Sequence, residues 1–216
     1  MSIHPPETPH HDDPSRGMLP EFARALVQAV EAKDPFTRRH SEHVVYYARR
    51  LGDYADLPGP LRDTLATAAL LHDIGKIAVP DSILTKPGRL TRQEFAFVRL
   101  HPDTGADILR NVTLLAEEAE VVRQHHERWD GTGYPRGLRG EMIAPAGRLL
   151  HIADSLDAML MRRTYKDGYS VPRTLRELRL GAGTQFDPEL ALLAARWCEQ
   201  NPTLLIRPGQ SAAAAA

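Results

Sequence analysis

Apolar residues recur every three or four positions through most of the chain, between two ends that lack this pattern. Such spacing places apolar side chains on one face of an α-helix, because about 3.6 residues make one turn. No run alternates apolar and polar residues with the period that a half-buried strand requires. The pattern therefore predicts an all-α fold, a multi-helix bundle in a single domain. The helices that we expect span residues 20–33, 35–54, 61–75, 92–100, 102–110, 114–126, 144–161, 171–181 and 188–199.

Several of these helices carry signals for where they begin and end. Asp-Pro pairs at 34–35 and 187–188 each combine an N-cap residue with proline at the first helical position. Thr91 and Glu94 have the spacing of a capping box. Gly75 stands where it would end the third predicted helix.

The two ends of the chain differ from the middle in composition. Residues 1–17 are rich in proline, histidine and aspartate and are expected to form a disordered tail. The segment 18–206 is expected to form the single helical domain, and 207–216 an unstructured end. A chain of 216 residues is long enough to bury one proper core.

Charge and hydropathy exclude some partners. The formal net charge of -1 argues against duplex nucleic acid or an acidic membrane surface as the main partner. No apolar run approaches the roughly 20 residues that cross a bilayer, and the N-terminus lacks the apolar segment of a signal peptide. The single cysteine, Cys198, fits a reducing compartment. We expect a cytoplasmic protein.

Histidine and aspartate recur on successive predicted helices. A helical bundle builds an inward metal cluster in this way, because each helix contributes one or two ligands. Imidazole and carboxylate without thiolate suit iron, manganese, zinc or nickel. One histidine alone would more often be a surface or hydrogen-bonded core residue. The positions concerned are His40, His72, Asp73, His101, His125, His126 and Asp154.

The His72-Asp73 pair is the strongest of these candidates. The apolar run LATAALL carries it into the interior, where an ionised carboxylate is costly unless a cation or a partner compensates for it. Lys76 could supply that compensation as a structural ion pair. The alternative, which we favour, is a metal ion.

A second pair, His125 and His126, ends a predicted helix just before a Gly-rich loop. Neighbouring side chains on a helix point about 100° apart. We therefore expect the two imidazoles to point apart and to serve different positions.

Four stretches carry a resemblance to a known family: LLHDIGKIAVPDSILTKPGRLT, HPDTGADIL, HHERWDGTGYPRGLRGEMI and ADSLDA. In this order and spacing they closely resemble the HD-GYP family of cyclic di-GMP phosphodiesterases, a branch of the HD superfamily of metal-dependent phosphohydrolases. The match runs from about Asp34 to Glu189. It implies a helical bundle of the HD-domain type that hydrolyses cyclic di-GMP to pGpG, with GMP as a further product left open.

The resemblance also implies a metal site. His40, His72, Asp73 and Asp154 match the ligand set of the superfamily. Asp73 would bridge to a second metal, held by His101 and His125, with His126 a spare ligand or a substrate contact. Two divalent ions, foremost iron or manganese, would activate water and neutralise charge on the phosphate.

Other positions are given roles by the same resemblance. Phe36 stands where members with three metals carry a glutamate, so we expect two metals. A third metal, bound differently near Glu42 and His43, is left open. Asp73 and Lys76 would be catalytic, and Lys76 would face a substrate phosphate rather than neutralise Asp73. His43 and His151 would pack beside the ligands. The residues expected to contact substrate are Lys76, Tyr134, Arg163 and Lys166.

The loop DGTGYP is expected to support the site and recognise substrate or partners. Gly131 and Gly133 would adopt backbone angles that other residues avoid, and Pro135 would stiffen the exit. By the same resemblance, this loop would be a contact for diguanylate cyclase (GGDEF) domains. The amphipathic first helix leaves a homodimer open.

Two other functions compete with this prediction. The same site could hydrolyse another cyclic dinucleotide or a nucleotide, since Arg162 and Thr164 depart from the family pattern. A non-catalytic module that binds cyclic di-GMP or a diguanylate cyclase is the other alternative. Its mark would be the loss of a ligand, and none of the expected ligands is missing.

Overall fold

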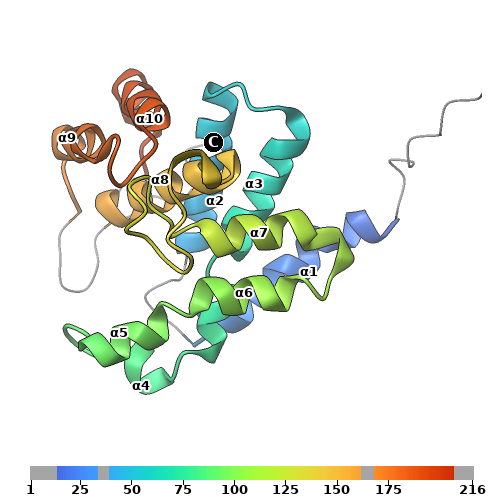
Figure 1. Cartoon of the computed structure of the whole chain (residues 1–216). Helices are drawn as coiled ribbons and strands as arrows, with labels where there is room; N and C mark the ends of the chain where they lie inside the picture. The colour runs from blue at the N-terminus through green and yellow to red at the C-terminus, as the bar shows by residue number, and fades with distance from the viewer. Residues whose placement is uncertain (1–13, 34–38, 162–167, 207–216) are drawn as a thin grey trace, which may run out of the picture.

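The computed structural model describes residues 14–33, 39–161 and 168–206. These residues form helices joined by turns and loops (Figure 1), and their single strand-like pairing is an isolated bridge between Ala182 and Phe186. The all-α prediction is confirmed. The α-helices are α1 (Pro14–Glu31), α2 (His40–Tyr54), α3 (Gly59–Leu71), α4 (Asp81–Leu84), α5 (Arg92–Val98), α6 (His101–Leu109), α7 (Ala116–Gln124), α8 (Pro145–Leu160), α9 (Val171–Gly181) and α10 (Pro188–Gln200). The 3₁₀ helices are η1 (Ile74–Ala78), η2 (Thr113–Leu115), η3 (Gly140–Met142) and η4 (Pro202–Leu204).

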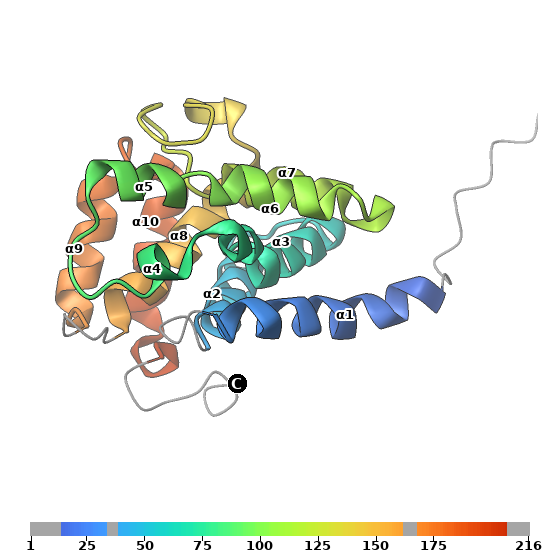
Figure 2. The ribbon, with the colours of Figure 1, turned by 90° about the horizontal axis from the view of Figure 1, so that it is seen from below.

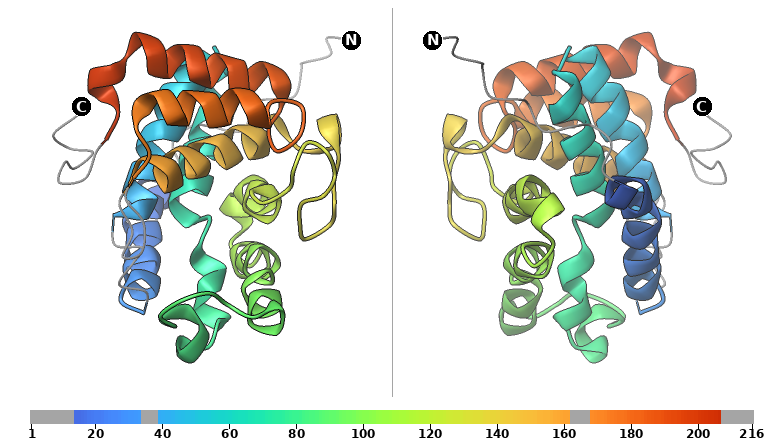
Figure 3. Two further views of the ribbon diagram at one scale, coloured as in Figure 1. Left: turned by 90° about the vertical axis from the view of Figure 1, so that its left-hand side faces the viewer. Right: turned by 90° about the vertical axis from the view of Figure 1, so that its right-hand side faces the viewer.

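Helices α2, α3 and α8 pack against one another at the centre of the bundle. Helix α7 packs on α3 and on α6, while α9 and α10 pair with each other beside α8. Figure 3 shows α8, α9 and α10 stacked at one end of the molecule. Helix α1 lies away from the stack of α9 and α10 (Figure 2), and it contacts α3 and η1.

The core is built from apolar side chains of these central helices. Leu51 of α2, Leu65 of α3 and Leu150 of α8 are fully buried. Tyr47 is also buried, and its hydroxyl accepts a hydrogen bond of 2.9 Å from the backbone N–H of Ile206. This bond ties the last described residues to the core. No described helix combines the length and the apolar character needed to cross a bilayer.

Two of the predicted helix starts are confirmed by their capping bonds. Glu94 donates its backbone N–H to Thr91 Oγ1 at 3.2 Å and accepts the N–H of Thr91 at 2.7 Å, which is a capping box. The Asp187 carboxylate caps α10 by accepting two backbone N–H groups. The proposed cap at 34–35 lies outside the described residues.

Gly75 does not end α3 as predicted. Helix α3 ends at Leu71, and Gly75 lies within η1. A side chain at this position would overlap the backbone of α6, at the carbonyl oxygen of His101 and the nitrogen of Gly105. The glycine is therefore required by a close approach of two backbones, not by a helix terminus.

Candidate metal centre

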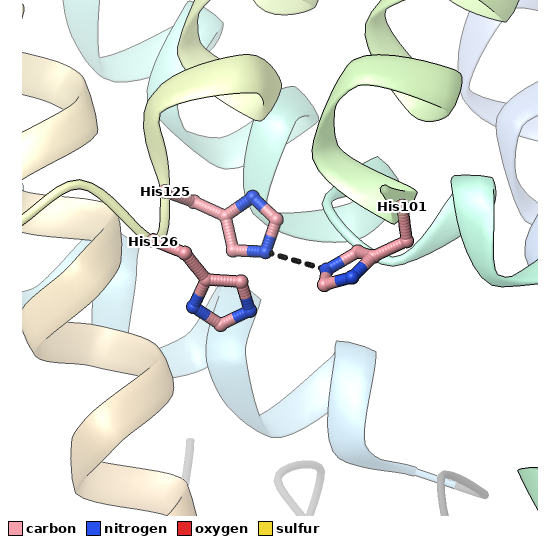
Figure 4. Close-up of side chains that lie close together, drawn as sticks. All are labelled: His101, His125 and His126. Atoms are coloured by element: carbon pink, nitrogen blue, oxygen red, sulfur yellow. Dashed lines mark hydrogen bonds between the residues drawn. The ribbon is translucent and has the colours of Figure 1, made fainter. Parts of the chain in front are cut away.

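Helix ends bring most of the predicted ligands together. His40 is the first residue of α2, His72 follows α3, and His101 is the first residue of α6. His125 and His126 follow α7 directly. The described residues form two compact groups of possible metal ligands. Within each group the donor atoms lie within 4.8 Å of one another, and Figure 4 shows the second group. The first group is His40, His72 and Asp73, and the second is His101, His125 and His126.

Asp73 lies between the two groups. Its Oδ2 is 3.4 Å from His72 Nε2 and 3.9 Å from His40 Nε2, whereas its Oδ1 is 3.4 Å from His101 Nε2. One carboxylate thus presents a different oxygen to each group. Asp154, from α8, lies on the side of the first group, with Oδ1 3.2 Å from His40 Nε2.

Backbone carbonyls orient three of the imidazoles. The Nδ1 atoms of His72, His101 and His125 lie 2.8, 2.6 and 2.5 Å from the carbonyl oxygens of Ala69, Val98 and Val122, respectively. Each partner precedes its histidine by three residues. Because Nδ1 donates in each case, the neutral ring leaves the Nε2 lone pair free to face the centre.

His125 and His126 do not point apart as predicted. Their ring centroids lie 4.0 Å apart with planes tilted by 42°, and both rings face His101 (Figure 4). Helix α7 ends at Gln124, so the angle of about 100° between helical neighbours does not apply to this pair. Both histidines therefore belong to one donor group.

Burial keeps the second group neutral. It lowers the pKa of His101 to about 4 and that of His126 to about 3, and it holds the pKa of His125 well below its usual range. Neutral imidazole is the form that binds metal.

The carboxylates of the centre are ionised. Burial alone would raise the pKa of Asp73, but Lys76 and His72 hold it well below its usual range. The pKa of Asp154 is likewise lowered against burial, by its hydrogen bond with His40. Burial would lower the pKa of His40, but its bonds to Asp154 and Asp157 raise it to about 10. The ionised carboxylates of Asp73 and Asp154 therefore favour positive charge at the centre.

These residues fit a divalent cation. His72 Nε2 is fully buried and has no hydrogen-bond partner among the described residues. His101 Nε2 and His125 Nε2 face each other at 3.1 Å, and both are directed there by their backbone bonds. Buried lone pairs of this kind are costly unless a donor or cation meets them. Imidazole and carboxylate together suit divalent transition metals.

Asp157 supports the first group from behind His40, and the sequence analysis missed it. Its Oδ2 accepts from His40 Nδ1 at 2.6 Å and its Oδ1 accepts from His43 Nδ1 at 2.9 Å. The available signal was the spacing in ADSLDA, because residues three apart on a helix share a face. Asp157 therefore lies beside Asp154 on α8, where it orients His40.

Lys76 differs from its predicted orientation. Its Nζ lies 2.6 Å from Asp73 Oδ2, so the ion pair considered as an alternative is present. A 3₁₀ helix has about three residues per turn, so side chains three apart lie on one line. The turn at η1 brings Lys76 over Asp73 for this reason.

The loop after His126 folds back onto the centre. Tyr134 donates its backbone N–H to the carbonyl oxygen of His126 at 3.2 Å, and its ring centroid lies 4.9 Å from that of His126. Arg99, near the end of α5, places its guanidinium 4.7 Å from the centroid of the Tyr134 ring. Tyr134 is thus held at the border of the second group, as expected for a residue that could meet substrate.

Glu127, a second residue that the sequence analysis missed, fixes this loop. Its buried carboxylate accepts the backbone N–H groups of Arg136 at 2.7 Å and Leu138 at 3.0 Å. Gly131 has the predicted positive φ, at +79°, but Gly133 does not; a side chain there would overlap the backbone at His126 and Glu127.

The remaining predicted residues lie away from the donor groups or outside the described residues. His43 Nδ1 contacts Asp157, and His151 Nδ1 contacts the carbonyl oxygen of Glu127 at 2.6 Å. Both pack beside the centre. Phe36, Arg162, Arg163, Thr164 and Lys166 lie outside the described residues.

A family model described as "HD domain" matches residues 24–190. The chain belongs to the HD domain family. The HD-domain chain is 40% identical over 182 residues to a Vibrio cholerae protein named 3'3'-cGAMP-specific phosphodiesterase 2. It is 41% identical over 172 residues to a cyclic di-GMP phosphodiesterase of Thermotoga maritima. These alignments cover 83% and 79% of this chain, but the chain spans only 35% and 47% of the two relatives.

Solved structures support the HD-domain fold. A cyclic GMP-AMP-specific phosphodiesterase of V. cholerae matches with a TM-score of 0.64 and 18% identity, over 86% of this chain and 51% of that chain. The phosphodiesterase HD domain of L. monocytogenes in complex with cyclic-di-AMP matches with a TM-score of 0.60 and 18% identity, over 86% of this chain and 100% of that chain. The prediction of an HD-type bundle related to cyclic di-GMP phosphodiesterases is confirmed.

Proposed function

We propose that this chain is a metal-dependent phosphodiesterase that hydrolyses cyclic di-GMP to pGpG. The observation that carries the proposal is the position of Asp73, whose two oxygens face two separate groups of imidazoles. A shared carboxylate between two donor groups is suited to a pair of divalent ions, for which we propose iron or manganese.

The candidate ligands divide between the two groups. His40, His72, Asp73 and Asp154 would hold one ion, and Asp73, His101 and His125 would hold the other, with His126 available as a further ligand. Divalent ions in such a site acidify water and offset the negative charge that develops on a phosphate undergoing in-line attack.

Residues around the two groups orient the candidate ligands and supply positive charge for the substrate. Asp157 fixes the ring of His40, and the backbone carbonyls fix the rings of the other histidines. The ammonium group of Lys76 lies beside Asp73, where its positive charge can also attract a substrate phosphate. From the family resemblance we further propose that Arg163 and Lys166 contact the phosphates.

The substrate has a second candidate. The relatives include proteins named for cyclic di-GMP and proteins named for 3'3'-cGAMP. Hydrolysis of 3'3'-cGAMP by the same donor groups is therefore the alternative. Binding of diguanylate cyclase domains by the loop at Tyr134, and a homodimer, are proposals that rest on the resemblance and on the amphipathic first helix.

Product chromatography tests the proposal. The protein is loaded anaerobically with Fe(II) or Mn(II) and given cyclic di-GMP or 3'3'-cGAMP in parallel. We expect pGpG from cyclic di-GMP, and its loss in Asp73→Ala but not in Asp63→Ala, which removes an exposed aspartate from α3. Faster conversion of 3'3'-cGAMP would select the alternative substrate. If protein that has bound metal converts neither dinucleotide, the proposed activity is wrong.

A further inference from the structure

Lys33, just beyond the end of α1, reaches a distant segment of the chain. Its Nζ donates to the backbone carbonyl oxygens of Ile77 at 2.8 Å and Val79 at 2.9 Å, and lies 3.2 Å from Asp81 Oδ1. The contacts join positions 44 and 46 residues apart. One ammonium group thus binds three oxygens around the end of η1.

The segment that Lys33 binds carries candidate catalytic groups. Helix η1 follows Asp73 directly and contains Lys76. A 3₁₀ helix of five residues is held by few bonds of poor geometry. Its last carbonyl groups lack partners within the helix. Lys33 supplies a charged donor at this end, where such bonds are stronger than neutral ones.

The other side of η1 is fixed by a backbone contact. Gly75 packs so closely on α6 that a side chain would overlap the carbonyl oxygen of His101. Helix η1 is therefore held between α6 on one side and the Lys33 ammonium, carried by α1, on the other. Removing either would free the turn that places Lys76 on Asp73.

Helix α1 itself reaches η1 mainly through apolar packing. Ala23, Val27 and Val30 are buried in the core cluster, and α1 contacts α3 and η1. These apolar side chains fix the helix, but they have no polar hydrogen to donate to η1. The Lys33 side chain is 28% exposed, so its bonds are partly shielded from water.

We propose that Lys33 is a positioning residue for Lys76: it anchors η1 to α1 and so holds the Lys76 ammonium on Asp73. The kinetic consequence rests on the phosphodiesterase function proposed above. The anchoring of η1 does not, and it can be measured separately.

The test compares three variants of the full chain. Lys33→Met keeps the aliphatic stem and removes the donors, Lys33→Arg keeps charged donors, and Arg24→Met removes an exposed charge from the same helix. In the manganese-loaded protein we expect Lys33→Met to lower kcat/KM for cyclic di-GMP by roughly tenfold, as for residues that orient metal-site groups. Lys33→Arg should recover part of the loss, and Arg24→Met should stay near wild type.

Hydrogen exchange followed by mass spectrometry supplies the readout that does not depend on activity. In Lys33→Met, amides of the segment 73–84 should exchange at least several-fold faster, while those of α10 should not change. A local increase together with the kinetic loss supports the proposal. Unchanged exchange at 73–84, a uniform increase throughout the chain, or a local increase without kinetic loss would overturn it.

Failure of the proposed function gives a different pattern. If the wild-type protein hydrolyses neither dinucleotide, the phosphodiesterase proposal fails and the exchange data decide the anchoring alone. Faster exchange confined to 73–84 would then keep Lys33 as the anchor of η1, whereas unchanged exchange would remove that role as well.

Discussion

Asp157 Oδ2 lies 2.6 Å from His40 Nδ1, so a carboxylate outside the two donor groups fixes the ring of a candidate ligand. The same carboxylate accepts from His43 through its other oxygen. Because each of its oxygens accepts from a different ring, Asp157 orients the imidazoles of both His40 and His43 on α2.

The first prediction concerns Asp157→Asn. The amide has one oxygen, so one imidazole would face an NH₂ group and lose its bond. We expect the affinity for Mn(II) to fall by about 10-fold or more, measured by titration in an EPR spectrometer. The exposed Asp63→Asn is the matched control. Equal Mn(II) affinity in Asp157→Asn and wild type would show that this bond does not support the centre.

Asp73 leads to a prediction about metal content. Because its two oxygens face different groups, Asp73→Ala should weaken both sites, whereas His40→Ala should weaken only the first. Elemental analysis after gel filtration should give about two ions per chain for wild type, about one for His40→Ala and fewer for Asp73→Ala. Retention of a full second ion by Asp73→Ala would argue against a shared carboxylate.

Substitution of Glu127 should weaken substrate binding without changing the metal content. In Glu127→Gln, one of the backbone N–H groups of Arg136 and Leu138 would meet an NH₂ group, at a local cost of about 1–3 kcal/mol. The loop that holds Tyr134 should loosen, so KM for the dinucleotide should rise more than kcat falls. Metal content should stay unchanged. Glu141→Gln, exposed in the same loop, should have no effect; a large effect there would mean that the loop is generally sensitive.

The burial of His151 predicts how the stability of the fold changes with pH. Burial lowers its pKa below the ordinary 6.5, and the neutral ring is satisfied because Nδ1 donates to Glu127 while Gln185 contacts Nε2 at 3.1 Å. The unfolded chain therefore binds a proton at a higher pH than the folded protein does. Stability from this group is complete above about pH 6.5 and is lost as the pH falls towards the folded pKa.

Urea denaturation of chelator-treated protein between pH 8 and pH 5 measures this effect. His101 and His126 titrate in the same direction, so the difference between wild type and His151→Gln isolates the contribution of His151. The variant should lose less stability on acidification. Parallel curves for the two proteins would show that His151 does not contribute.

The helical pattern and the capping signals could be predicted because they depend on neighbours in the sequence. Thr91 and Glu94 contact each other across a single turn, and Asp187 caps the helix that it precedes. The sequence also predicts that His40, the His72-Asp73 pair, His101 and His125 gather, since these positions lie on four different helices or helix ends.

Contacts that depend on where a helix stops could not be predicted in this way. His125 and His126 share a group because α7 ends at Gln124, and Lys76 meets Asp73 because the chain changes from α to 3₁₀ geometry after His72. The bond from His40 to Asp157 joins residues 117 positions apart. Only the tertiary packing of α2 on α8 creates it.

The close contact of Gly75 with α6 bears on how inactive relatives should be recognised. Asp73 lies two residues before Gly75, and a side chain at position 75 would overlap the carbonyl oxygen of His101, so this backbone contact helps to set how closely the two donor groups approach. Alanine at that position would push the groups apart while leaving every ligand in the sequence. A survey that counts only histidines and aspartates would score such a chain as intact, although the backbone contact between η1 and α6 would be broken.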